Sequence, residues 1–260
     1  MKRRLFWGVL CAVLLLQSAS ATRPIPVQVD GIHLPSSAYV ENGITYVPLR
    51  YLLDAFGGWN IRWDSTLRSA IATRETISLT ANPTTDIITI GSATYSARVT
   101  LENGRTYVPL RLVTEALNGH VIWDPYLDGA AVTSPGASYD AQNLYWLSRI
   151  ISAESRGEPI EGQIAVGNVI MNRVSSPEFP NTIPAVIFDQ KNAVQFEPVA
   201  NGTLYQAPAQ ISVQAARHVL DGTIILEDAL YFYAPALSQG LWINTNRTYH
   251  STIGCHRFYL

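Results

Sequence analysis

An internal repeat constrains this chain more than any other feature. Residues 41–50 read ENGITYVPLR and residues 102–111 read ENGRTYVPLR, so at least eight of ten positions are identical. The similarity continues through residues 52–58 and 113–119, and Trp63-Asp64 corresponds to Trp123-Asp124 after a one-residue deletion. Such a repeat sets the architecture before any single residue is considered, and it predicts two equivalent structural units.

Each unit has the pattern of a hairpin followed by a helix. Asn-Gly between extended segments predicts a hairpin turn, Thr-Tyr-Val predicts a short strand, and the Leu-Arg pair after proline opens a helix of about two turns. Gly58 and Gly119 are expected at the C-terminal caps of these helices. Further strands are expected at residues 69–73, 87–90, 94–99 and 129–133. The prediction is a small α+β domain of two pseudo-equivalent halves, spanning residues 22–134.

The tandem ENGxTYVPLR blocks resemble the copper amine oxidase N-terminal-like domain, a stalk-type module, over roughly residues 26–134. The name implies no copper here, because His33 and His120 are isolated and no residues have metal-ligand spacing. Both histidines are expected to be structural or surface residues. The resemblance implies an accessory domain that targets the wall or contacts an envelope or spore-coat protein. Trp63 and Trp123 are expected to pack in the core, with stacking on sugars as the alternative.

Residues 1–21 have the layout of a secretory signal peptide. A basic start (Lys2, Arg3 and Arg4) precedes an apolar run over residues 5–16 and the small-residue cleavage site Ala19-Ser20-Ala21. The apolar run is short for a bilayer span, so no stable membrane span is expected after cleavage. An uncleaved N-terminal anchor is the alternative. The mature chain is therefore predicted to be secreted; its assignment to the cell wall or spore envelope comes from the family resemblance described below.

Charge and cysteine usage exclude some partners and some sources of stability. Loss of residues 1–21 leaves 15 basic against 20 acidic residues, a net charge of about −5. No basic stripe is present, which argues against nucleic-acid binding. Cys11 leaves with the signal peptide, so Cys255 is the one cysteine of the mature chain and no intramolecular disulfide can form. Core burial must therefore supply the stability.

Residues 135–260 are predicted to form a second, mainly helical domain after a turn-rich linker at residues 134–138. Asp140 is expected to cap a helix over residues 141–153, and further helices are expected at residues 160–174, 181–188 and 211–220. Residues 229–233 are predicted to be extended, and the tail from residue 241 is expected to be loop-rich. The overall fold class is α+β.

Glu154 is the candidate catalytic residue. It is expected at the end of the first helix of this domain, before Gly157 and Pro159 break the chain. Partial burial at the rim of a helical core raises a carboxyl pKa, and a carboxyl that is protonated near neutral pH can act as the acid in glycosidic cleavage. Ser155 is expected to orient Glu154 by a hydrogen bond. A solvent-exposed glutamate at a helix end is the alternative.

Residues 151–188 resemble the SleB/CwlJ family of cell-wall hydrolases, the spore-cortex-lytic enzymes. Later blocks of the family follow in order at residues 195–205, 229–235 and 253–258, so the resemblance covers about residues 141–258. It implies a lysozyme-like domain that acts on peptidoglycan as a lytic transglycosylase without a cofactor. Glu154 would protonate the oxygen between N-acetylmuramic acid and N-acetylglucosamine, and would then deprotonate the C6 hydroxyl that closes a 1,6-anhydro ring. Cys255 departs from the family, where an Asn or similar residue is expected.

Further residues are candidates for binding the glycan. Aromatic rings bind sugar faces, and amides bind acetamido groups. The candidates of these two types are Gln195, Phe196, Tyr231, Tyr233 and Trp242. Ser155 and His256 are further candidates. Each aromatic residue has core packing as its alternative. His250, Cys255 and His256 do not have zinc-site spacing, so no metal is expected. Glu158 and Glu161 are explained by a turn and a helix N-terminus, and Glu197 is a weaker candidate for an assisting role.

Two alternatives to a lytic transglycosylase stay open. A non-catalytic wall-binding or spore-coat structural protein would sediment with peptidoglycan without cutting it. An N-acetylmuramoyl-L-alanine amidase would release the stem peptide, and it would need a zinc site of histidines and carboxylates.

Overall fold

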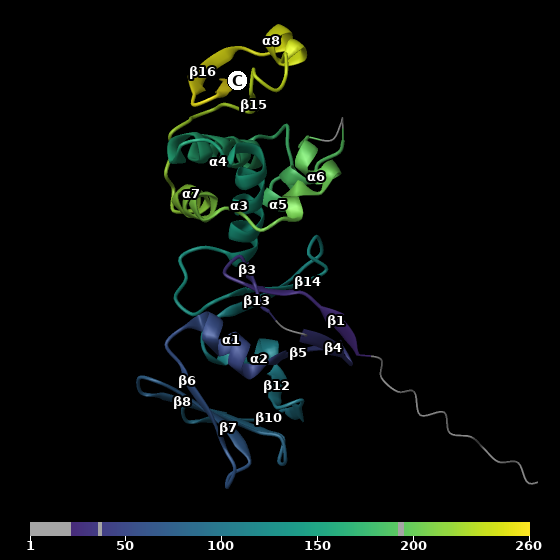
Figure 1. Ribbon diagram of the computed structural model, residues 1–260, viewed down its shortest axis with the longest axis vertical. Helices are drawn as coiled ribbons and strands as arrows, with labels where there is room; N and C mark the ends of the chain where they lie inside the picture. The colour runs from purple at the N-terminus through teal and green to yellow at the C-terminus, as the bar shows by residue number, and fades with distance from the viewer. Residues whose placement is uncertain (1–21, 36–37, 192–194) are drawn as a thin grey trace, which may run out of the picture.

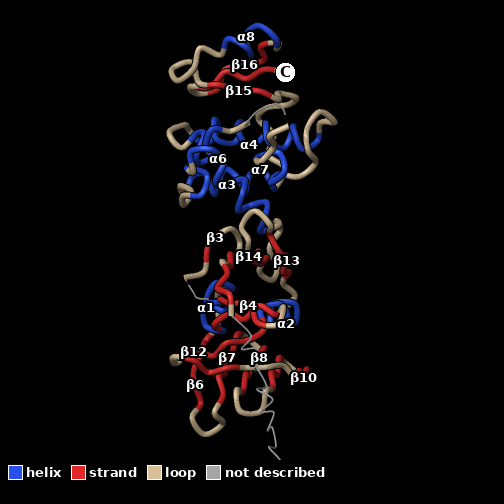
Figure 2. The backbone as a smooth tube through the Cα atoms, turned by 90° about the vertical axis from the view of Figure 1, so that its right-hand side faces the viewer, coloured by secondary structure: helices blue, strands red, loops and turns tan. Residues whose placement is uncertain are grey.

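The computed structural model describes residues 22–35, 38–191 and 195–260, so the predicted signal peptide lies outside the described residues. Figure 1 shows an elongated molecule with a sheet-rich N-terminal domain at one end, helices in the middle and a small sheet at the other end. The tube in Figure 2 shows the same succession of strand and helix layers. The α+β prediction is confirmed. No helix in the described ranges has the length and apolar character that a membrane crossing requires.

The two repeat blocks meet in one central sheet. Each forms a hairpin, β4 (Ala38–Glu41) with β5 (Ile44–Pro48) and β11 (Thr100–Glu102) with β12 (Arg105–Pro109). The Asn-Gly residues of both turns have positive φ, as the expected turn type requires. β5 and β12 pair antiparallel with Val47 opposite Val108, both fully buried, and β1 (Arg23–Ile25) adds an edge strand beside β4. The pseudo-twofold relation between the repeats therefore passes close to Val47 and Val108.

After each central strand the chain repeats one order of elements. In the first repeat α1 (Leu49–Phe56) precedes the hairpin of β6 (Asn60–Asp64) and β7 (Ser69–Arg74). In the second, α2 (Leu110–Ala116) precedes β13 (His120–Asp124) and β14 (Gly129–Thr133). The first hairpin extends through β8 (Ile77–Asn82), β9 (Ile87–Ile90) and β10 (Ala93–Ser96), whereas β14 pairs in parallel with β2 (Val27–Val29), which pairs with β3 (Ile32–His33).

Two expectations for the repeats are wrong in detail. The helix caps are Gly57, with φ 74°, and Leu117, followed by Asn118 with φ 65°, rather than Gly58 and Gly119. Trp63 and Trp123 do not pack in the core, because they are 43% and 44% exposed. Both lie on edge strands, β6 and β13, which have a neighbouring strand on one side only. Each tryptophan lines a surface pocket instead.

The helical layer is built on α3 (Ala141–Ser155), α4 (Ile160–Ser175) and α7 (Gln210–Leu220), which pack against one another. Asp140 accepts a hydrogen bond from the Asn143 amide and so caps α3, as predicted. A Cβ at Gly167 would lie 2.8 Å from Val219, so glycine lets α4 and α7 approach closely. Shorter helices complete the layer, namely α5 (Ile183–Ile187), α6 (Glu197–Asn201) and the 3₁₀ turn η1 (Thr203–Tyr205).

The C-terminal tail is ordered structure, so the loop-rich expectation is wrong. β17 (His256–Tyr259) lies between β15 (Tyr231–Tyr233) and β16 (Tyr249–Ile253), with α8 (Leu241–Asn246) before β16. β16 is mostly exposed and polar, which removes the alternating hydrophobic pattern that signals a strand. β17 carries the fully buried Phe258, which anchors this sheet to the helical core.

Polar contacts join the N-terminal domain to α3. Trp146 donates its indole N–H to Asp124 Oδ2 over 2.7 Å, and both side chains are buried. His33 Nε2 lies 2.7 Å from the Tyr145 hydroxyl, so the histidine that was expected to be an ordinary structural residue lies in the junction. Arg149 donates to the Gly31 carbonyl at 3.3 Å and stacks over the Tyr145 ring at 3.6 Å. The helix that carries Glu154 is thus anchored at its other end by the N-terminal domain.

Candidate active site

Glu154 lies in the last turn of α3 and is half-buried. The turn at residues 156–159 ends the helix, which leaves this carboxyl between the helical core and the segments that follow. The pKa of Glu154 is raised from 4.5 to about 7, mainly because the carboxyl is buried; the charge of Glu197 adds to this rise and Arg173 opposes it. A large fraction of Glu154 is therefore protonated near neutral pH, as a general acid requires.

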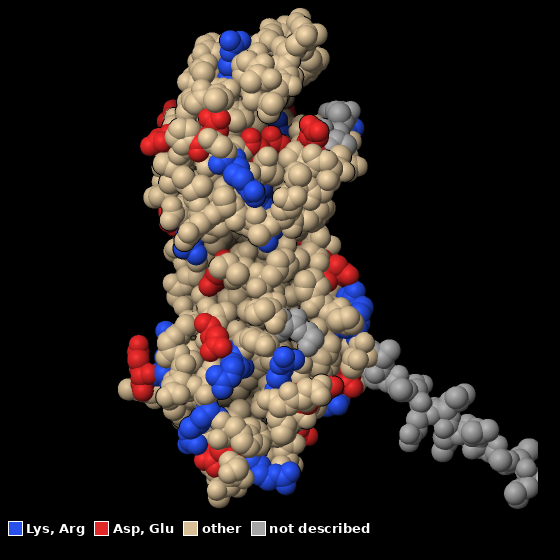
Figure 3. Space-filling model, in the orientation of Figure 1, with Lys and Arg blue, Asp and Glu red and all other residues tan. Residues whose placement is uncertain are grey.

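Glu154 has a second carboxylate as an electrostatic neighbour. Glu197 opens α6, is exposed, and is close enough for its charge to disfavour ionisation of Glu154. α3 and α6 are in contact, which brings these two side chains from separate parts of the chain to one region. In Figure 3, acidic side chains gather where the helical layer meets the C-terminal sheet. The sequence prediction ranked Glu197 as the weaker assisting candidate, and it is the carboxylate that influences Glu154.

Arg173 is the site residue that the sequence analysis missed. It lies in the last turn of α4, is 5% exposed, and its guanidinium carbon lies 4.8, 5.1 and 5.6 Å from the ring centroids of Phe179, Phe196 and Tyr231. Burial lowers the pKa of Arg173 to about 10, and the charge of Glu154 is among the groups that oppose this shift. The available signal was three polar residues, Asn168, Asn172 and Arg173, within the otherwise apolar stretch of residues 164–174.

The guanidinium of Arg173 is fixed by one hydrogen bond, but another of its N–H groups has no partner. Its Nε donates to the Leu230 carbonyl at 2.7 Å, just before β15, whereas its Nη1 is buried and has no hydrogen-bond partner. A buried guanidinium donor without a partner is costly and unusual in a folded protein. The guanidinium of Arg173 therefore interacts electrostatically with Glu154 and keeps one buried donor without an acceptor.

Ser155, beside Glu154, and the two predicted residues of the second family block, Gln195 and Phe196, lie in different surroundings. Ser155 is buried and donates its hydroxyl to the Ile151 carbonyl at 2.7 Å, so the expected hydrogen bond that orients Glu154 is absent and the serine closes the helix instead. Phe196 is 3% exposed and packs against Arg173, which makes it a wall of the site rather than an open platform. Gln195 is half-buried and directly precedes it, at the start of the α6 segment.

The predicted aromatic residues of the C-terminal sheet divide into two groups. Tyr231 contacts the guanidinium of Arg173, accepts a hydrogen bond from Arg247, and lies 6.0 Å from the ring of the 57% exposed Trp242. These two rings extend from the Glu154–Arg173 region toward solvent. Tyr233 instead stacks on Tyr259 and hydrogen-bonds Asn244, so it supports the sheet.

His256 forms a separate cluster with Glu158. Its Nδ1 lies 3.8 Å from Glu158 Oε1, its ring packs edge-on against Phe232, and burial lowers its pKa against the opposing charge of Glu158. Glu158 Oε2 also accepts the backbone N–H of Cys255 at 2.8 Å. This geometry connects the end of α3 to the β16–β17 turn, so Glu158 is not a simple turn residue. The exposed thiol of Cys255 lies on that turn. Within the described ranges, His, Cys, Asp and Glu side chains form no group of three that could hold a metal.

Comparison with known families covers both domains. The cell wall hydrolase family model matches residues 157–259, and the copper amine oxidase N-terminal domain model matches residues 28–128. Glu154 lies just before the residues of the first match.

Several similar proteins are spore cortex-lytic enzymes. The spore cortex-lytic enzymes of Bacillus subtilis strain 168 and Bacillus cereus are 35% and 37% identical over 131 and 120 residues, which are 50% and 46% of this chain. These stretches are 41% and 45% of the relatives' own lengths, so the chain spans less than half of each. The solved catalytic domain of a germination-specific lytic transglycosylase, SleB from Bacillus anthracis, is 36% identical, with 47% of this chain matched to 98% of that domain at a TM-score of 0.43. On sequence, the chain contains a SleB-like cell wall hydrolase domain, with a copper amine oxidase N-terminal domain in front of it.

Proposed function

We propose that this chain is an exported lytic transglycosylase of peptidoglycan in which Glu154 is the catalytic acid and then the base. The single observation that carries the proposal is the half-buried carboxyl of Glu154, whose pKa is raised to about 7. Such a group can be protonated before the reaction and ionised during it, at one pH.

The reaction balances on this one group. Glu154 gives its proton to the oxygen that links N-acetylmuramic acid to N-acetylglucosamine, and the bond from that oxygen to C1 of muramic acid breaks. The C6 hydroxyl of the same muramic residue attacks C1, and its proton passes to the Glu154 carboxylate. A 1,6-anhydro end forms, and Glu154 is protonated again without water entering.

The neighbouring side chains have supporting roles in this proposal. Positive charge develops on the sugar ring as the C1–O bond breaks. The exposed carboxylate of Glu197 favours that charge and raises the pKa of Glu154. Arg173 has a buried Nη1 without a partner, which suits an acetamido oxygen of the bound strand. Tyr231 and the exposed Trp242 provide ring faces for neighbouring sugars.

The polymer is proposed from the relatives. Their names assign them to the spore cortex and the cell wall, and we extend that assignment to this chain as secreted action on cortex or wall peptidoglycan during germination or wall remodelling. The cut strands and the free anhydro ends are the expected products on both polymers.

Product analysis tests the proposal directly. Purified vegetative sacculi and spore cortex are digested side by side in isotopically labelled water, and the muropeptides are examined by mass spectrometry. Anhydro ends without heavy oxygen are expected, and they should vanish in Glu154→Gln while the melting temperature is not lowered. Glu161→Gln, an exposed carboxylate in the first turn of α4, is the matched control and should digest normally.

Each other product pattern contradicts a specific part of the proposal. Reducing muramic ends carrying heavy oxygen would mean hydrolysis, with Glu197 as the carboxylate that activates water. Free stem peptides with intact glycan strands would mean amidase activity. If the unaltered chain sediments with sacculi but does not cleave them, it is a non-catalytic wall-binding protein.

A further inference from the structure

Two pockets of the N-terminal domain are related by the internal repeat. The first-repeat pocket, about 570 Å³, lies between α1 and β6 of the first repeat and the β11–β12 turn of the second. The second-repeat pocket, about 370 Å³, lies between α2 and β13 of the second repeat and the β4–β5 turn of the first. Each repeat thus completes the pocket of the other, and both volumes suit a small ligand or one or two sugar units.

The first-repeat pocket combines cations with open aromatic surface. Its lining includes three arginines, a half-buried tyrosine and the 43% exposed tryptophan of the repeat, namely Arg50, Arg62, Arg105, Tyr51 and Trp63. No carboxylate is among its lining residues. Figure 3 shows several basic side chains, with acidic ones among them, on the part of the surface that the N-terminal domain forms. The pocket is therefore a positively charged depression with an aromatic wall.

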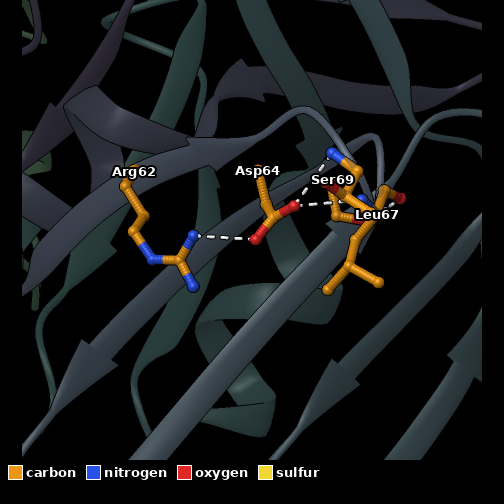
Figure 4. Close-up of polar contacts among 5 residues, drawn as sticks. Arg62, Asp64, Leu67 and Ser69 are labelled. Carbon is orange, nitrogen blue, oxygen red and sulfur yellow. Dashed lines mark hydrogen bonds and ion pairs between the residues drawn. The ribbon is translucent and has the colours of Figure 1, made fainter.

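The three guanidinium groups are positioned by the fold. Arg50 donates to the Ile61 carbonyl at 3.0 Å, and Arg105 lies 5.7 Å from the centre of the Tyr51 ring. Arg62 pairs with Asp64 at 2.9 Å, and Figure 4 shows that Asp64 is itself held by backbone N–H groups of the following turn. In the described part of the chain, no carboxylate pairs with Arg50 or Arg105. Each guanidinium has five N–H donors, so donors remain for a ligand.

The second-repeat pocket supplies an internal comparison. At the positions of Arg105 and Arg62 it has Ile44 and Ile122. Its tryptophan, Trp123, is as exposed as Trp63, but the guanidinium carbon of the chain's own Arg23 lies 5.8 Å from its ring centre. Its arginine, Arg111, is paired with Glu115 at 2.9 Å. The same backbone frame thus carries one pocket with three arginines and one pocket with a single arginine that is already paired.

We propose that the first-repeat pocket is a second glycan-binding site, which holds an acidic saccharide strand outside the catalytic domain. A pyranose ring packs its apolar face on Trp63, while the arginines bind carboxylates carried by the strand. The choice of peptidoglycan as the strand rests on the proposed function, because that is the polymer the other domain would cut. Its stem peptides supply the carboxylates. A wall polymer of polyol phosphates would use the arginines but would leave the exposed tryptophan without a sugar ring.

Binding to sacculi tests this site separately from cleavage. The full chain with Glu154→Gln, which keeps the polymer intact, is sedimented with sacculi that have been stripped of phosphate polymers. Trp63→Ala, and Arg50→Ala combined with Arg105→Ala, should each weaken binding by about tenfold or more. The matched controls are Trp123→Ala, and Arg23→Ala combined with Arg111→Ala, in the second-repeat pocket. Amidation of the sacculus carboxylates should weaken the parent as the arginine variant does.

The outcomes separate this proposal from the proposed function. Equal binding by the first-repeat variants and their controls, with unchanged melting temperatures, overturns the site whether or not the chain cleaves glycan. Binding that requires the phosphate polymers overturns the choice of a carboxylate-bearing strand. A selective loss in the first-repeat variants supports the site even if the unaltered chain releases no anhydro ends. Loss of cleavage in Glu154→Gln with normal binding by all variants supports only the proposed function.

Discussion

Trp146 donates its indole N–H to Asp124 across the junction of the two domains, over 2.7 Å and out of contact with solvent. Asp124 also accepts the backbone N–H groups of Tyr126 and Leu127, so it orders a turn of the second repeat while it holds α3. Its repeat equivalent, Asp64, accepts the corresponding N–H groups of Thr66 and Leu67, but it pairs with Arg62 at the surface. The two copies of one motif therefore differ in their partners. Asp124 contacts the hydrolase domain, whereas Asp64 contacts an arginine of the first-repeat pocket.

Asp124→Asn is expected to weaken the coupling of the domains. Its side-chain oxygen can still accept the two turn amides, but its NH₂ group would face the Trp146 N–H and leave a buried donor unpaired. Such a loss costs about 1–3 kcal/mol. Calorimetry should show a lower melting temperature and a broader transition as the domains separate thermally. Asp64→Asn is the matched control and should have a smaller effect, and equal effects of both changes would contradict the role of the junction.

Local physics explains how much of this fold was predictable. The Asn-Gly turns, the short strand and the proline before each helix act within a few residues, so residues 41–50 and 102–111 were interpreted correctly. Asp140 caps α3 by an equally local contact. β16 was missed because its exposed polar sequence carries no hydrophobic alternation. The exposure of Trp63 follows from the edge position of β6, which depends on how distant strands pair.

The candidate site was also predictable only in part, because it depends on packing between segments that are distant in sequence. Glu154 could be singled out because its segment resembles the SleB/CwlJ family; the predicted helix end beside it supports the choice only weakly. The influence of Glu197 and Arg173 on its pKa depends on the packing of α3, α4 and α6, which no local pattern contains. Ser155 is adjacent in sequence, yet its hydroxyl bonds to the carbonyl one turn earlier, as serine often does in helices.

The raised pKa of Glu154 predicts a pH-dependent stability. The folded chain favours the protonated carboxyl, so this group's stability contribution is fully present below pH 4.5 and is lost as pH rises through about 7. At one pKa unit per 1.36 kcal/mol, the loss is at most about 3 kcal/mol. Glu154→Gln should therefore unfold at higher urea than the parent at about pH 8, and similarly to it at about pH 4. A constant difference at both pH values would contradict the buried carboxyl.

The pH profile of cleavage should report the same group. If Glu154 is the acid, the rate falls at high pH with a midpoint near pH 7, as the proton is lost. Glu197→Gln removes a charge that raises the Glu154 pKa, so the midpoint should move to lower pH by roughly half a unit. High salt should shrink this shift, because Glu197 is exposed. An unchanged midpoint in Glu197→Gln would mean that the charge of Glu197 does not influence the pKa of Glu154. Glu161→Gln is the control and should leave the midpoint unchanged.

Gly254 is expected to be required for the contact between Glu158 and the β16–β17 turn. Its φ is +58°, and an added Cβ would collide with Glu158 Oε2, the atom that accepts the Cys255 N–H. Gly254→Ala should therefore break this bond and loosen the sheet that carries Tyr231. Gly202→Ala is the matched control, since Gly202 has φ +82° and nothing lies within 4 Å of its added Cβ. The control should lose only the left-handed strain, about 1–2 kcal/mol, and Gly254→Ala should lose more. Hydrogen exchange should rise across residues 249–259 in Gly254→Ala alone, and equal exchange in both variants would mean that backbone strain, not the Glu158 contact, sets the requirement for glycine.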